Sequence, residues 1–92
     1  MEKQENQFNL LNGTFTRKET KEILVTLFTN KIQFHRLKNF SHEERFGKSD
    51  PHAVERIPEL KKTLEEILSL LERNGEESQF EIHADIKLKV LK

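Results

Sequence analysis

The segment from Pro58 to Asn74, PELKKTLEEILSLLERN, carries the strongest helical pattern in the chain. Its apolar residues recur every three or four positions, the spacing of a helix with one buried side. They are Ile57, which extends the stripe at its start, and Leu60, Leu64, Ile67, Leu68 and Leu71. Asn74-Gly75 supplies a stop signal at the end. Because one helix cannot bury this stripe alone, the chain must provide a second layer.

The start of this helix has two possible positions. Pro58 suits the first turn, where its missing N–H has no partner within the helix. Asp50-Pro51 offers an earlier start, with Asp50 as the N-cap and Pro51 at the first helical position. The sequence leaves both starts open.

Length and composition indicate one small domain, residues 1–92, with residues 1–7 expected to fray. The chain has no cysteine, which excludes disulfides, a thiolate nucleophile and a cysteine-based zinc site. No apolar run is long enough to span a membrane, and no signal-peptide pattern opens the chain. We therefore expect a cytoplasmic protein with no membrane contact.

Charge is balanced overall but uneven along the chain. Residues 17–48 hold eight Lys/Arg and four Asp/Glu, a net +4, whereas residues 50–85 hold four and ten, a net −6. The net charge of zero argues against non-specific binding to a polyanion. The asymmetry is typical of a surface laced with ion pairs, or of halves or copies that attract each other.

A first long helix is predicted from Arg17 to Lys38. Thr16 and Glu19 form a capping-box pattern at its start. The apolar residues of this segment project onto one broad side: Ile23, Leu24, Leu27, Phe28, Phe34 and Leu37. A strand over residues 23–28 is the competing interpretation, because the middle of the segment is rich in β-branched residues.

The stretch from Asn39 to Asp50 predicts a break and a short helix. Ser41 to Glu44 repeats the capping-box pattern, so a one-turn helix is expected over His42–Phe46. Phe40 and Phe46 are expected to close the end of the helical hairpin with their rings.

The C-terminal segment from Gln79 to Leu91 alternates between apolar and polar residues, as a strand with one buried face does. A weaker strand is predicted over Phe8–Leu11. The fold class is therefore α+β: two long helices, in an antiparallel hairpin with a short intervening helical turn, packed on a small antiparallel sheet. That sheet consists of the short N-terminal strand and the long C-terminal strand, and a dimer is a possible way to complete it.

The C-terminal strand suits antiparallel pairing with a second copy of itself. With a twofold axis at Ala84, residue i faces residue 168 − i, so His83 meets Asp85 and Glu81 meets Lys87. The predicted dimer strand consists of Phe80, Ile82, His83, Ala84, Asp85, Ile86 and Leu88. The alternative is a monomer whose N-terminal segment pairs with part of this strand.

No chemistry-bearing motif is found. The four histidines, His35, His42, His52 and His83, lack any metal-ligand spacing, so no metal site is predicted. Adjacent acids such as Glu65-Glu66 point about 100° apart on a helix and make no catalytic pair. We predict no catalytic residues and no cofactor.

A non-enzymatic protein-interaction or regulatory role is the remaining expectation, with an unknown protein partner. The candidate partner-binding residues are Arg36, Phe40, Arg45 and Phe46, since the chain has neither Trp nor Tyr to form a binding hot spot. The alternative is a nucleic-acid-associated homodimer, which the zero net charge disfavours.

Overall fold

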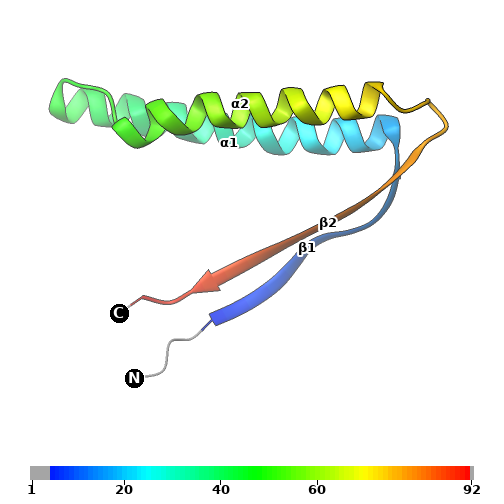
Figure 1. Cartoon of the computed structure of the whole chain (residues 1–92). Helices are drawn as coiled ribbons and strands as arrows, with labels where there is room; N and C mark the ends of the chain where they lie inside the picture. Colours follow the sequence, from blue (N-terminus) through cyan, green and yellow to red (C-terminus); the bar gives the residue numbers. More distant parts are fainter. Residues whose placement is uncertain (1–4, 92) are drawn as a thin grey trace.

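The computed structural model describes residues 5–91. The element order is β1 (Glu5–Thr16), α1 (Arg17–Phe46), α2 (Pro51–Glu72) and β2 (Gln79–Lys89) (Figure 1). The expected α+β class is confirmed: two helices pack against a two-stranded antiparallel sheet. Of the N-terminal segment expected to fray, residues 1–4 lie outside the described part, and the rest begins β1.

The two strands pair along almost their full length, from Glu5 opposite Lys89 to Thr16 opposite Gln79. The N-terminal strand is therefore far longer than the predicted Phe8–Leu11. A register shift between Asn9 and Leu11 explains why the sequence pattern concealed it. One extra residue at this point breaks the two-residue alternation of β1 on which the sequence prediction relied.

The Thr16 capping box at the start of α1 is confirmed. The Thr16 Oγ1 accepts a hydrogen bond from the backbone N–H of Glu19 at 3.1 Å, and the Glu19 carboxylate accepts one from the Thr16 N–H at 2.9 Å. These bonds satisfy two groups that a helix start leaves free. They also fix the point where β1 turns into α1.

The predicted break near Asn39 is wrong, because α1 continues without interruption to Phe46. Ser41 lies inside this helix and cannot act as an N-cap. No Gly or Pro occurs between residues 17 and 46 to stop the helix. The stop is Gly47, whose φ of 70° is left-handed and whose N–H donates to the Glu43 carbonyl at 2.8 Å.

Phe40 and Phe46 do not close the hairpin end, since 61% of each residue is exposed. Because α1 is unbroken at this point, the side chain of Phe40 points away from α2. Hydrogen bonds close the turn instead: the Asp50 N–H donates to Asn39 Oδ1 at 2.7 Å, and His42 Nδ1 lies 2.8 Å from the Lys48 carbonyl oxygen.

Helix α2 begins at Pro51, which decides between the two starts. Asp50 is the N-cap, and its side chain accepts from the His52 N–H at 3.1 Å. Pro58 lies within the helix.

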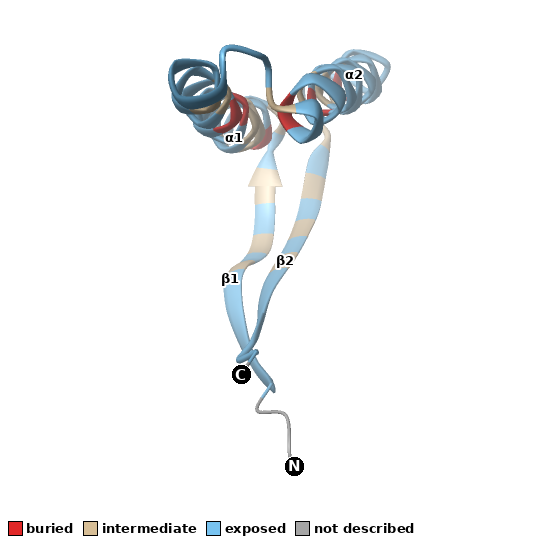
Figure 2. Ribbon diagram, turned by 90° about the vertical axis from the view of Figure 1, so that its left-hand side faces the viewer, coloured by how far each residue is buried: buried red, intermediate tan, exposed pale blue. Residues whose placement is uncertain are grey.

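In the described part of the chain, the core is a single seam between α1 and α2 (Figure 2). The predicted stripe of α2 is confirmed, with Leu60 and Leu71 buried and the other four residues half-buried. From α1 the seam receives Ile32 and His35. Leu27, Phe34 and Leu37, predicted on the buried side, are exposed instead. The straight path of α1 turns the Ile32–His35 side toward α2, which leaves these three side chains outside the seam.

The ribbon of β1 and β2 leaves the base of the helical hairpin and diverges from it toward the chain termini (Figures 1 and 2). The radius of gyration is 17.0 Å. A compact domain of this length has about 12 Å. The two layers therefore meet at one end only.

We expect Leu71→Ala to lower the free energy of unfolding by about 2–5 kcal/mol, because Leu71 is 3% exposed in the only core seam of the described residues. Val54→Ala, at a residue that is 54% exposed on the same helix, is the control and should change it by less than about 0.5 kcal/mol. Urea unfolding followed by circular dichroism, at one fixed protein concentration, measures both. Equal losses would show that the seam is not the core.

Candidate interaction surface

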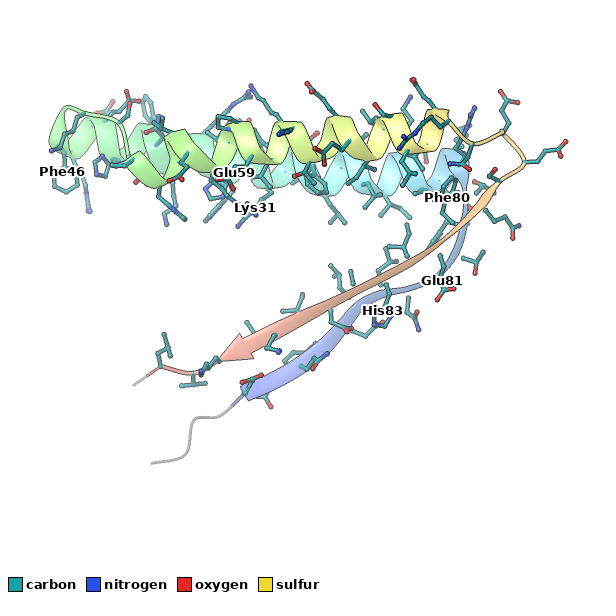
Figure 3. All side chains as sticks on the ribbon, in the orientation of Figure 1. Lys31, Phe46, Glu59, Phe80, Glu81 and His83 are labelled. Carbon is teal, nitrogen blue, oxygen red and sulfur yellow. The ribbon has the colours of Figure 1, made fainter. Side chains whose placement is uncertain are left out.

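One face of the β-ribbon is apolar and faces the helices. Phe80 lies on the helix side of the ribbon, whereas Glu81 and His83 lie on the opposite side (Figure 3). The apolar face continues through cross-strand pairs such as Leu11–Ala84 and Phe8–Ile86. Near the helices these residues are half-buried, but Phe8, Ile86 and Leu88 are 53%, 40% and 55% exposed.

A matching apolar face lies on α1. Lys31 lies on the side of the helical hairpin that faces the ribbon (Figure 3), and its Nζ sits 4.8 Å from the centre of the Phe34 ring. Leu27 and Leu37 share this face, because they lie seven residues before and three after Phe34. The exposed fractions of Leu27, Phe34 and Leu37 are 40%, 50% and 61%.

Together these two faces form what we call the inner surface. Its ribbon part consists of Phe8, Leu11, Phe80, Ile82, Ala84, Ile86 and Leu88, and its helix part of Ile23, Leu27, Phe34 and Leu37. Most of it is accessible because the two layers diverge.

The accessible area of the chain supports this description. It is 7693 Å². A compact monomer of 11.0 kDa has about 5,600 Å². Isolated exposed apolar residues are normal on monomers, but contiguous ones mark interaction sites. The inner surface therefore has the character of an interface.

The outer face of the ribbon is polar and tied together by hydrogen bonds around Asp85. Asn9 Nδ2 donates to one carboxylate oxygen at 3.0 Å, and Gln7 Nε2 donates to the other at 3.1 Å. His83 lies between Asp85, at 3.0 Å, and the Asn12 side chain, at 3.2 Å. The bond from Asn9, followed by those from Gln7 and His83, lowers the pKa of Asp85, although its partial burial acts in the opposite direction. The network keeps Asp85 ionised and stabilises the strand pair.

His35 is the buried titratable group of the α1–α2 seam, with 6% of the residue exposed. Its Nε2 has no hydrogen-bond partner, and its ring meets those of Phe34 and His52 edge-on. Burial lowers the pKa of His35, and the positive charges of Lys31, His52, Arg56 and Lys38 lower it further. His35 is therefore held neutral at pH 7.

The structure does not bring the four candidate partner-binding residues onto one surface. Arg36 and Phe40 lie one turn apart on α1. Arg45 follows Arg36 by nine residues, which places it about 180° around the helix. Phe46, the last helical residue, packs on His42 with ring centres 4.7 Å apart. All four are exposed, and their role in partner binding stays a prediction.

The predicted dimer strand is β2, and the structure divides its residues between the two faces. The apolar ones lie on the inner surface, whereas His83 and Asp85 lie in the outer network. One edge of β2 pairs with β1, and within residues 5–91 no strand pairs with its other edge. Self-pairing about Ala84 stays a prediction.

The sequence interpretation missed that α1 has two apolar faces. The signal is present in the spacing. One set, Leu24, Phe28, Ile32 and His35, is buried or half-buried near α2, and a second set, Leu27, Phe34 and Leu37, is exposed. Each set alone has helical spacing, and a helix with two such stripes contacts more than one layer.

Among the residues that the structure describes, no group of three or more acidic or histidine side chains is arranged to hold a metal ion. No helix in that part of the chain is long and apolar enough to cross a membrane. Comparison with protein families, with curated proteins and with solved structures finds no match for this chain.

We expect the stability of the protein to fall as the pH drops below 6.5 toward the lowered pKa of His35. In this range the unfolded chain binds a proton at His35 that the folded chain does not, so acid favours unfolding. His35→Leu should flatten this part of the pH profile, while His42→Asn, which lies outside the seam and keeps an N–H donor for the Lys48 carbonyl, should keep it. Urea midpoints at several pH values between 5 and 8 measure the effect. A wild-type profile that is flat in this range contradicts it.

Proposed function

We propose that this chain is a non-enzymatic interaction protein that binds another polypeptide through its inner surface. The supporting observation is the continuous set of accessible apolar side chains on the two facing layers. Burying apolar area stabilises an interface by roughly 25 cal/mol per Å². The inner surface provides this stabilisation only when a partner covers it.

A protein partner fits this surface better than a nucleic acid does. Its centre is made of Phe, Leu and Ile side chains, and charged groups such as Lys31 and Lys38 stand at its border over the Phe34 ring. An apolar centre with a charged rim is the anatomy of protein interfaces. A nucleic-acid surface requires a concentration of positive charge, and this chain has a net charge of zero.

A catalytic role fits less well, because the sequence carries no catalytic motif. As part of the same proposal we assign the protein to the cytoplasm, where a cysteine-free chain suits the reducing environment.

Photo-crosslinking tests the proposal directly. A benzophenone amino acid replaces Phe34 or Leu88 of the inner surface, or Val54 as the control, in the cells that naturally express the chain. Val54 is as exposed as Leu88, at 54% against 55%, but lies on α2. Val54 and Arg56 are two residues apart, an angle of about 200° around α2. Arg56 lies near His35, as Lys31 does, so Val54 points away from the side of the hairpin that carries Lys31.

The expected result is a discrete protein adduct from both inner positions and none from Val54, detected by mass spectrometry. A copy of the chain itself or a different protein in the adduct equally supports the proposal. Adducts with nucleic acid alone, or equal yields at all three positions, contradict it.

A further inference from the structure

We propose that the polypeptide bound by the inner surface is a second copy of this chain, arranged about a twofold axis at Ala84. In this dimer the β2 strands pair edge to edge, and the base of each helical hairpin covers the far end of the other copy's ribbon. The inference rests on the proposed function and names the partner.

The exposed area matches what such a dimer needs. Each copy exposes about 2,000 Å² more than a compact monomer of its mass. A standard interface buries about 800 Å² per partner, and obligate homodimers bury more and are more apolar. One partner of the same size is therefore sufficient to cover the inner surface.

The edge of β2 is suited to the pairing. Its first edge is bonded to β1, so the second edge presents unpaired backbone groups, which attract another strand. Antiparallel pairing about Ala84 places Ile82 opposite Ile86 and Phe80 opposite Leu88 on the inner face. On the outer face it places Glu81 opposite Lys87, an attractive pair. The result is a four-stranded sheet with one apolar face.

The same register brings the two helical hairpins to the correct places. In the pairing, Phe80 at the base of one ribbon lies beside Leu88 near the tip of the other. The end of α2, which precedes β2 at that base and lies on the β2 side of the hairpin (Figure 2), therefore stands beside the partner's ribbon tip. That tip is where the residues of the inner surface are most exposed.

Lengths along the two layers agree with this arrangement. Leu37 is twenty residues beyond Arg17, a distance of about 30 Å along a helix. The eleven residues of β2 extend about 36 Å. Phe34 and Leu37 thus lie over the far part of their own ribbon, where the base of the second copy enters. A single symmetric contact covers the exposed parts of both layers in both copies.

The solution mass of the wild-type chain is the first test. Light scattering after gel filtration at tens of micromolar should give twice 11.0 kDa. A mass of one chain at this concentration overturns the inference. Crosslinks from Phe34 and Leu88 to a different protein would still support the proposed function in that case, so the two failures are distinguishable.

A disulfide tests the axis, since the chain contains no cysteine of its own. Residues directly opposite in an antiparallel pair have Cα atoms about 4.5–5.5 Å apart, a separation that a disulfide can bridge. Ala84→Cys should therefore form a covalent dimer under mild oxidation, whereas Val54→Cys should remain a single chain on a non-reducing gel. Equal crosslinking of the two variants overturns the proposed axis.

A charge placed on the helix part tests the rest of the contact. Leu37→Asp should raise the dimer dissociation constant by about 30-fold or more, as loss of a central contact does. Val54→Asp should leave the dissociation constant unchanged. Leu37 is 61% exposed in the single chain, so the helical content should persist, which circular dichroism verifies. A dimer that tolerates Leu37→Asp as well as it tolerates Val54→Asp overturns the proposed contact.

Discussion

The packing of α1 against α2 is the interaction on which the rest of the structure depends. Among residues 5–91, the buried apolar residues are Ile32, Ala53, Leu60 and Leu71, and all belong to these two helices. The antiparallel hairpin brings the start of α1 and the end of α2 to the same base. β1 and β2 extend from that base. They pair with each other because the hairpin holds the end of β1 close to the start of β2. Loss of the seam would therefore separate the strands as well as the helices.

A core confined to one seam leaves the chain with a large accessible surface and a small buried one. Folding of a small domain is a close balance between apolar burial and conformational entropy. A single chain in which the ribbon contacts the helices only at its base uses little of its apolar content. The inner surface holds the remainder, so the proposed binding through it would add stability as well as function. A chain with so much exposed apolar surface would be stabilised by a partner that is always present. A second copy of the chain is such a partner.

The polar features stabilise particular parts of this arrangement. The Asp85 network ties Gln7, Asn9 and His83 together on the outer face of the ribbon, so that face stays in water and the apolar face remains directed inward. His35 fills the seam as a neutral ring surrounded by cationic side chains. Its burial makes the seam, and every element that depends on it, sensitive to acid.

Local signals in the sequence determined the elements, whereas contacts between elements decided where they end and what they cover. The Thr16 capping box, the α2 stripe from Ile57 to Leu71 and the alternation of β2 each involve residues close in the chain, so their patterns were readable. The full length of β1 was not, because its partner lies some seventy residues away and a register shift interrupts its alternation. The second capping pattern at Ser41 had no effect because an uninterrupted helix satisfies the same backbone groups. The inner surface was also hidden, since only the packing of α1 on α2 determines which of its two apolar stripes is buried and which remains exposed.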